Sequence, residues 1–522
     1  MMTQLIRRLY RDEEGYSLVI AILLLSIMMV LLAVALQAGT SSLQQSSLSL
    51  EWSKALTVAE AGLDDSITRL GESRQASNPC SMSTSTVCSG GGGQYQVGWT
   101  QSGGAIVVTS IGYYPTKTAP KFVREVQATY EPVRSFQYAL FSQTSLDIKN
   151  GAKVLGDVYS DGNVTVGTGA NICGSVISSA GGVVLANNAQ VLKNASDSSV
   201  LSGYDCTGKS GMVWTGGSGG IQGSSGVTVW GDAKASAPST IGCSASSSNY
   251  PVKNSSGGSG FVVDGAVTAC GSISGVSGAT AQHPGTASST PVPVTFPQFV
   301  FDPNNYSTNA ADPLHLQCYP TGGTCGSNDS TTAISSFNAY LATHKTALTG
   351  TFAVWQRSPT AMTSNGSCTT SSTTQICLDG ITLGGDFTLI TNAPVDFGNT
   401  STVTTTSSSI AADLAVISTY QPAAGTTCDT NGGDCSIYGN NSIIFDSGDA
   451  NDPDDGVVGL LYTTGKMAFN NSPQSGDPGE GALYASSMNF KNNYDIAYNS
   501  RIDRVLGFGK TYERTLWQEL NV

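Results

Sequence analysis

The sequence predicts an α+β protein that is mainly β. We expect a long N-terminal helix, a small antiparallel sheet, and then a parallel β-solenoid-like head with disulfide-clipped insertions. Three observations predict this: a long apolar stretch without proline, three short alternating segments after it, and an 18-residue repeat of apolar positions. Only 12% of the 522 residues are charged and 61 are glycine, which is typical of short strands and tight turns.

The charge balance restricts the partners. The chain has 24 Lys and Arg against 37 Asp and Glu, which gives a net charge of −13. It therefore offers no basic field to hold phosphates, and we expect no nucleic-acid partner. Hydrophobic residues make up 39% of the chain, which is enough to bury a core and excludes general disorder.

The N-terminus combines a charged leader with an apolar run. Residues 1–15 contain three arginines, and Leu18–Leu36 is apolar except for one serine. Nineteen helical residues span about 28 Å, close to the ~30 Å hydrocarbon core of a bilayer. Because the arginines precede the run, the positive-inside tendency places the leader in the cytoplasm and the rest outside. Helical spacing of apolar residues continues to Leu70, which predicts one helix over 16–72.

Three features of this helix occur together. The leader ends in Gly15, the apolar helix opens on Tyr16-Ser17-Leu18-Val19-Ile20, and Ala59-Glu60-Ala61-Gly62-Leu63 lies near its end. With these features, about 60–70 residues of the chain resemble the type IV pilin superfamily, and most of all its PilX-type minor pilins. The helix would then be a pilin-type helix.

The resemblance implies a processing and assembly route. A prepilin peptidase would cut after Gly15 and leave Tyr16 as the N-methylated first residue. The helix would lie in membrane lipid until an inner-membrane assembly platform extracts it, and it would then pack against other pilins or pseudopilins. The expected assembly-helix residues are Leu18, Val19, Ile20, Leu24 and Glu60.

Two positions depart from the family pattern. The first mature residue is usually Phe and is Tyr16 here, and the fifth is Glu in major pilins and Ile20 here. A buried Glu is tolerable in a helix bundle because it can pair with a neighbour's positive N-terminus. Since this chain cannot satisfy a neighbour's amine in that way, we expect a minor subunit, placed at the fibre tip or used sparingly.

Two other functions for the apolar run compete with this one. An uncleaved signal anchor could hold an unrelated exported domain in the membrane. A cleaved signal peptide is disfavoured because the run is longer than the usual apolar segment of about 7–15 residues.

Residues 73–135 predict a small antiparallel β module. Its three alternating segments are separated by a glycine pair and by a proline-containing stretch, and they are Tyr95–Thr100, Ala105–Tyr113 and Phe122–Tyr130. The resemblance to pilins implies that this sheet covers the amphipathic half of the helix.

Residues 136–200 predict coils of a parallel β-solenoid. Leu146 and Ile148 recur 18 residues later as Val164 and Val166, and a looser copy starts at Val183. Such coils stack alternate apolar residues on similar neighbours, which explains the low charge.

A second repeat lies nearer the C-terminus. Gly459–Tyr462 is matched by Gly481–Tyr484. We therefore expect residues 377–522 to return to the solenoid, with 201–376 as insertions and connections. Within these, residues 333–348 predict a short helix, and residues 515–520 predict a cap over the last coil.

Twelve cysteines, an even number, favour an oxidising compartment and disulfides. No Cys-x-x-Cys spacing is present, which disfavours zinc. The sequence does not fix the connectivity, and nearest-neighbour pairing is the simplest assignment. It would join Cys80 to Cys88, Cys318 to Cys325, Cys368 to Cys377 and Cys428 to Cys435.

No motif for catalysis stands out. The three histidines are widely spaced, and neither a His-Glu-x-x-His motif nor a phosphate-binding loop is present, so we expect no enzyme and no cofactor. One acidic cluster could hold Ca²⁺ through carboxylate oxygens. Its order does not fit the EF-hand template, which favours a solvated acidic turn instead. The candidate ligands are Asp446, Asp449, Asp452 and Asp454.

The sequence thus predicts a structural subunit. We expect a minor pilin or pseudopilin that starts in the bacterial cell membrane and ends in an extracellular type IV pilus-like fibre. Its β-rich head would serve adhesion or fibre initiation. The alternative is a membrane-anchored surface β-helix that cleaves or binds polysaccharide. Such enzymes need clustered charged residues on one solenoid face, whereas Asp157 and Asp161 are scattered on the coils.

Overall fold

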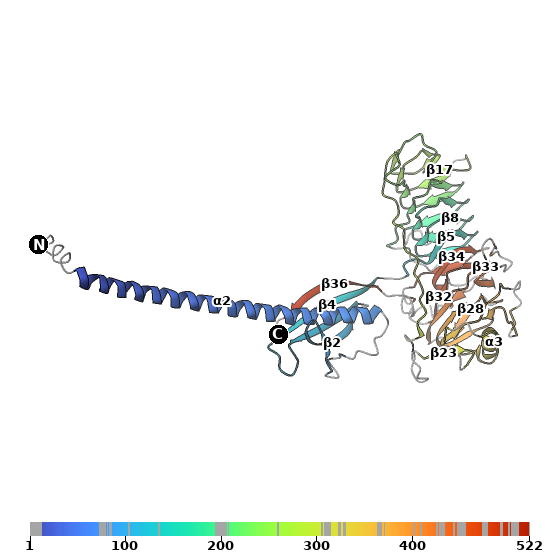
Figure 1. The fold of residues 1–522 in the computed structure, drawn as a ribbon. Coiled ribbons are helices and arrows are strands. Elements are labelled where there is room, and N and C mark those ends of the chain that lie inside the picture. Colours follow the sequence, from blue (N-terminus) through green and yellow to red (C-terminus); the bar gives the residue numbers. More distant parts are fainter. Residues whose placement is uncertain are drawn as a thin grey trace. The chain divides into compact units, whose positions relative to one another are not determined.

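A computed structural model gives the fold, which consists of two compact units (Figure 1). Met1–Val133 and Lys510–Val522 form the small module, and Arg134–Gly509 form the head. The structure describes residues 13–71, 80, 82, 86–102, 105–133, 136–193, 206, 208–257, 260–303, 306, 315–321, 325–326, 330–362, 368–369, 371–399, 402–407, 410–423, 426, 428, 434–441, 444–445, 456–471, 479–490, 494–499, 502 and 511–520.

The small module contains one long helix and one antiparallel sheet, as predicted. The helix is α2 (Glu13–Gly71). The sheet has the order β1-β2-β3-β4-β36. Its strands are β1 (Cys88–Gly90), β2 (Gly93–Ser102), β3 (Ala105–Tyr114), β4 (Phe122–Val133) and β36 (Thr511–Leu520).

Strand β36 corrects the prediction for the end of the chain. It pairs with β4, with Thr511 opposite Val133 and Leu520 opposite Glu125. The expected cap over the last coil is therefore wrong, and so is the assignment of these residues to the solenoid region 377–522. A solenoid cap and an edge strand carry the same alternating pattern, so the pattern alone does not select the pairing partner.

The head is a parallel β-solenoid with three strand faces, as predicted. Its first run contains β5 (Leu140–Ile148), β6 (Lys153–Leu155), β7 (Val158–Ser160), β8 (Asn163–Val166), β9 (Asn171–Cys173), β10 (Val176–Ser178), β11 (Val183–Leu185), β12 (Gln190–Leu192), β13 (Val213–Thr215), β14 (Ile221–Gly223), β15 (Val227–Val229), β16 (Ala233–Ala235), β17 (Val252–Asn254), β18 (Phe261–Val263), β19 (Ala266–Ala269), β20 (Ile273–Ser274), β21 (Val276–Ser277) and β22 (Ala281–Pro284).

A second run begins at the other end of the stack. It contains β23 (Leu316–Tyr319), the predicted helix α3 (Ala333–His344), β24 (Leu348–Val354), β25 (Ile376–Cys377), β26 (Thr382–Thr391), β27 (Val395–Asp396), β28 (Thr402–Thr405), β29 (Ala411–Ser418), β30 (Ile437–Asn441), β31 (Ile444–Phe445), β32 (Gly456–Thr463), β33 (Lys466–Asn471), β34 (Gly479–Phe490) and β35 (Asp495–Ala497).

The strand register confirms the sequence repeats. Leu146 lies opposite Val164, and Val164 lies opposite Val183. In the second run Tyr462 lies opposite Tyr484. The alternate apolar residues of these strands form one buried core inside the coils.

The expectation that residues 201–376 leave the solenoid is wrong for its first part. Strands β13 to β22 continue the stack, with Val176 of β10 opposite Val213 and Ala233 opposite Val267. The loops between these coils differ in length, which removes the fixed period. Each strand still pairs in register with the strand of the next coil, although these strands are only two to four residues long.

The two runs join in the middle of the stack. Strand β34 pairs with β5 and β35 pairs with β6, all in parallel (Figure 1). The chain therefore enters the solenoid at its centre, builds coils to β22, crosses to β23, and builds coils back to its starting point. We name the crossing segment, residues 285–303, the return strap.

A column of buried hydroxyls follows one corner of the coils. Ser142, Ser160 and Ser178 lie opposite one another on β5, β7 and β10. Ser178 Oγ donates a 2.7 Å hydrogen bond to the Gly162 carbonyl oxygen, and Ser142 Oγ donates a 2.7 Å bond to the Ser145 carbonyl oxygen. These bonds satisfy buried carbonyl groups where the backbone turns from one face to the next.

The return strap covers an outward-facing aromatic ladder, which we define as Phe141, Tyr159, Tyr462 and Tyr484. These four residues are in consecutive register on β32, β34, β5 and β7. Phe296 of the strap packs on them, with its ring centroid 5.5 Å from Phe141 and 5.2 Å from Tyr462. The head therefore has a second apolar cluster outside its coils.

Six disulfides link the twelve cysteines. Nearest-neighbour pairing is confirmed for the four close pairs, which are Cys80 with Cys88, Cys318 with Cys325, Cys368 with Cys377, and Cys428 with Cys435. The two bonds that the sequence left unassigned join Cys173 to Cys206 and Cys243 to Cys270.

Two of the close pairs also contribute to apolar clusters of the head. Cys318 and Cys325 are partly buried against the cluster that contains the aromatic ladder. Cys435 is fully buried with Tyr438, and Cys428 packs against the same small cluster. These cysteines therefore clip their loops and bury apolar surface at the same time.

Candidate functional site

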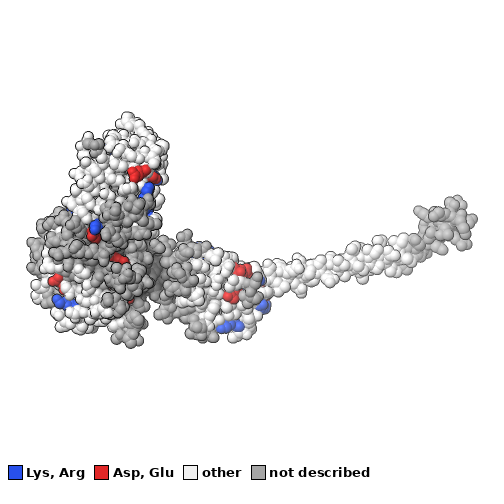
Figure 2. All heavy atoms as spheres, turned by 180° about the vertical axis from the view of Figure 1, so that it is seen from behind, with Lys and Arg blue, Asp and Glu red and all other residues white. Residues whose placement is uncertain are grey.

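The candidate functional site is the long helix α2 and its contact surface on the small sheet. No charged residue occurs between Glu14 and Glu51, and the exposed stem of the helix is uncharged in Figure 2. The predicted assembly residues Val19, Ile20 and Leu24 are 58%, 46% and 55% exposed. Such a helix is long and apolar enough to serve as a membrane anchor or a signal sequence.

The predicted cleavage position lies in the first turns of this helix. Gly15, Tyr16 and Leu18 all have helical backbone. Residues 1–12 of the leader lie outside the described part of the chain. The predicted cleavage position and the apolar stem belong to one continuous helix of 59 residues, about 90 Å long.

The distal part of α2 is buried against the sheet. Val58, Ala59 and Leu63 pack with Val97 of β2 and Val108 of β3, among other apolar residues. These residues are at most 1% exposed. The helix therefore changes along its length from an exposed apolar stem to an amphipathic segment with one buried face.

Glycines let the helix backbone approach the strands closely. A Cβ atom on Gly112 of β3 would lie 2.4 Å from the Ala55 carbonyl oxygen and 2.5 Å from the Ala59 nitrogen. A Cβ atom on Gly62 of the helix would lie 2.2 Å from Ser110 Oγ. No side chain fits at either position without a shift of the helix or of its neighbours.

This contact gives a physical role to the segment Ala59-Glu60-Ala61-Gly62-Leu63. Ala59, Gly62 and Leu63 are buried against the sheet, whereas Glu60 is exposed. The small residues set the distance between helix and sheet, and Glu60 lies on the face that remains open to other molecules.

A charged and aromatic group links the helix, β4 and β36. The Arg124 guanidinium lies 4.3 Å from the Trp52 ring centroid, and its Nη1 is 3.3 Å from Glu519 Oε1. Lys121 and Glu51 form a second ion pair at 2.9 Å. Neither ion pair could be predicted from residue spacing, because the partners of each lie far apart in sequence.

The acidic cluster proposed for Ca²⁺ cannot be placed. Asp446, Asp449, Asp452 and Asp454 lie outside the described residues. Elsewhere, among the residues that the structure describes, no group of three or more His, Cys, Asp or Glu side chains converges as metal ligands would.

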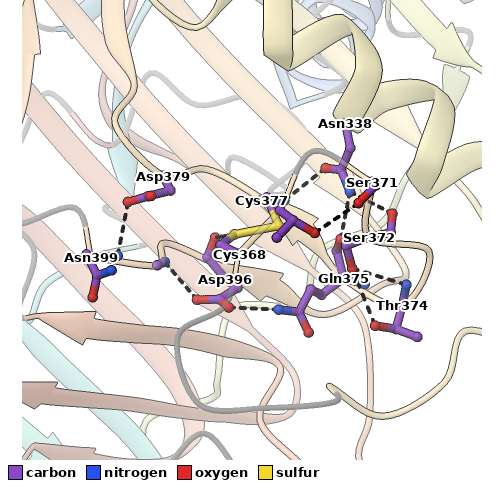
Figure 3. The surroundings of a disulfide bond; sticks show 12 residues. Asn338, Cys368, Ser371, Ser372, Thr374, Gln375, Cys377, Asp379, Asp396 and Asn399 are labelled. Carbon is purple, nitrogen blue, oxygen red and sulfur yellow. Dashed lines mark hydrogen bonds between the residues drawn. A yellow bond between two sulfur atoms is a disulfide. The ribbon is translucent and has the colours of Figure 1, made fainter.

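The head buries one carboxylate beside the Cys368–Cys377 disulfide (Figure 3). Asp396 accepts a 2.7 Å bond from the Gly398 N–H and a 2.8 Å bond from Gln375 Nε2. Burial raises the pKa of Asp396 to about 6, against the lowering effect of the Gly398 bond. Its hydrogen-bond partners are an amide and a backbone N–H, which hold the loop in place.

The fold and this site together define a protein with a membrane-length helical stem, a small sheet packed against residues 55–66 of the same helix, and a solenoid head with disulfides. No family model, no curated protein and no solved structure matches the chain.

Proposed function

We propose that this chain is a minor pilin or pseudopilin, a structural subunit of a type IV pilus-like fibre. The observation that carries the proposal is the single helix α2, which is exposed from Val19 to Leu50 and packs one face against a sheet from Ala55 to Ser66. A simple anchor needs only about 20 residues. A helix that extends well beyond this length, and whose small residues let a sheet pack closely against it, is suited to packing beside other such helices.

The proposed mechanism has three steps. A prepilin peptidase cuts after Gly15, the assembly platform draws the helix out of the lipid, and the stem packs beside sister stems. Ile20 stands where major pilins carry a carboxylate, so the subunit cannot neutralise a neighbour's N-terminal amine. A tip position removes that requirement, and the solenoid head is then available for adhesion or fibre initiation.

Mass spectrometry of sheared fibres and of membranes tests the proposal. We expect the mature chain to begin at Tyr16 and to appear in the fibre fraction. A Gly15→Leu variant should keep residues 1–15 and stay in the membrane. Gly39→Ala is the matched control, because the added Cβ would meet nothing within 4 Å beyond its own turn of helix, and it should be processed normally.

Retention of Met1 or Met2 on the surface-exposed chain would contradict the pilin assignment. In that case the anchored β-helix that cleaves or binds polysaccharide becomes the better assignment, and binding of the surface-exposed chain to polysaccharide would support it.

A further inference from the structure

The small module is completed by a strand that follows the whole head in sequence. Strand β36 comes after Arg134–Gly509, yet it belongs to the sheet that begins with β1. During export from the N-terminus, the helix and β1 to β4 therefore emerge long before β36.

Strand β36 is paired with β4 along nearly its full length, from Thr511 opposite Val133 to Leu520 opposite Glu125. Gln518 Nε2 also donates a 2.8 Å bond to Gln127 Oε1. Without β36, this edge of β4 presents a row of unpaired N–H and C=O groups, which are available to any other extended chain.

Two groups of contacts extend from β36 through β4 to the helix. At one end Glu519 pairs with Arg124, and Arg124 stacks on Trp52 of α2. At the other end Arg514 of β36 lies opposite Tyr130 of β4, and the buried Tyr130 belongs to the apolar cluster that contains Val58 and Leu63 of α2. The packing of the helix on the sheet therefore depends partly on β36, which is exported after the whole head.

We propose that residues 511–520 are a completion latch. The edge of β4 is a strand-accepting site, and the helix becomes firmly seated on the sheet only after the strand that follows the head has been exported and has paired there. The consequence for assembly rests on the proposed function: a chain whose head has not fully crossed the membrane is not competent to enter a fibre.

Trypsin cleavage at Lys54 in the membrane-bound chain tests the latch. A chain that ends at Gly509 should be cut much faster than the complete chain. A synthetic peptide of residues 510–522 should restore protection, whereas a scrambled peptide should not. Equal protection with and without β36, or no effect of the peptide, would overturn the proposal.

Charge exchange keeps the test independent of any folding defect in the shortened chain. Arg124→Glu and Glu519→Arg should each raise the cleavage rate at Lys54, by up to about fivefold for a pair at the surface. The double variant should recover toward the original rate. No recovery would show that the ion pair does not connect β36 to the helix seat.

A fibre assay separates the latch from the proposed function. If the unchanged chain never enters fibres, the pilin assignment fails, while the trypsin result on the latch stands by itself. If the shortened chain loses protection and still enters fibres normally, the latch does not control assembly, and that part of the inference is overturned.

Discussion

At the scale of single residues, small residues have a different structural role in each of the two units. In the small module, Gly112 and Gly62 allow the helix and sheet to come closer than any Cβ would permit. In the head, Ser142 and Ser178 are small enough to fit a coil corner, and their hydroxyls bond carbonyl groups where the backbone turns from one face to the next. Glycine thus sets the distance between the helix and the sheet, whereas serine provides hydrogen bonds to backbone carbonyl groups.

Gly112→Ala should destabilise the small module. The new Cβ would meet the helix backbone at 2.4 Å, and overpacking of this kind typically costs about 1–3 kcal/mol. Thermal unfolding of the small module, followed by protease resistance of α2, measures the change. Gly39→Ala is the matched control and should be neutral or stabilising by up to about 1 kcal/mol, because Ala favours helix and the site is open.

Asp396→Asn should change how the head's stability depends on pH. The pKa of this carboxyl is raised from 3.8 to about 6 by burial, so its extra stability is full below pH 3.8 and is lost as the pH rises through about 6. Wild type should therefore lose about 2–3 kcal/mol of unfolding free energy between pH 4 and pH 7 that the Asn variant, which does not titrate, keeps. Parallel pH profiles for the two proteins would contradict a buried, titrating Asp396.

At the scale of elements, the return strap shows how a segment that contains no strand of its own is held in place. Its side chains pack on the aromatic ladder, and the ladder's hydroxyls bond its backbone. Tyr159 Oη accepts a 2.8 Å bond from the Val294 N–H, and Tyr462 Oη donates a 2.7 Å bond to the Pro297 carbonyl oxygen. Tyrosine suits this position because one residue supplies both an apolar ring and a polar tip.

Tyr462→Phe should loosen the strap. It removes the hydroxyl that bonds Pro297 and also accepts the Phe299 N–H, and an unsatisfied buried group costs about 1–3 kcal/mol. Hydrogen exchange at Phe299 and thermal unfolding of the head measure the loss. Tyr494→Phe is the control: that buried hydroxyl has no partner among the described residues, so its removal should be neutral or stabilising.

At the scale of the whole molecule, the chain order differs from the spatial order twice. The head is inserted between β4 and β36 of the small module. Within the head, the coils that come second in sequence stack directly before the first. Both arrangements bring distant segments together, so each unit closes only when its later part is present.

Replacement of the head by a two-residue turn should leave a folded small module. Val133 and Thr511 are register partners, so Asn-Gly in place of residues 134–510 would form a tight hairpin between β4 and β36. Circular dichroism and trypsin resistance at Lys54 would show a seated helix. Complete digestion of this short chain would mean that the module depends on the head for its stability.

Elements with a local period could be predicted from the amino-acid order alone. The apolar run predicted the helix, alternating residues predicted β2 to β4, and the 18-residue spacing of Leu146 and Val164 predicted parallel coils. Cysteine spacing likewise predicted the four short-range disulfides, including Cys318 with Cys325 and Cys428 with Cys435. These features depend on neighbours in sequence or on a fixed repeat, which a linear pattern records directly.

The pairing of distant segments emerged only from the three-dimensional fold. The alternation of residues 511–520 would be the same in a coil cap and in an edge strand. Strands β13 to β22 show no fixed sequence period, because the loops between them differ in length. The contact of Trp52, Arg124 and Glu519 and the strap over the aromatic ladder join residues that lie far apart in sequence. Their partners are set by burial and backbone pairing over the whole fold, and no local pattern encodes these.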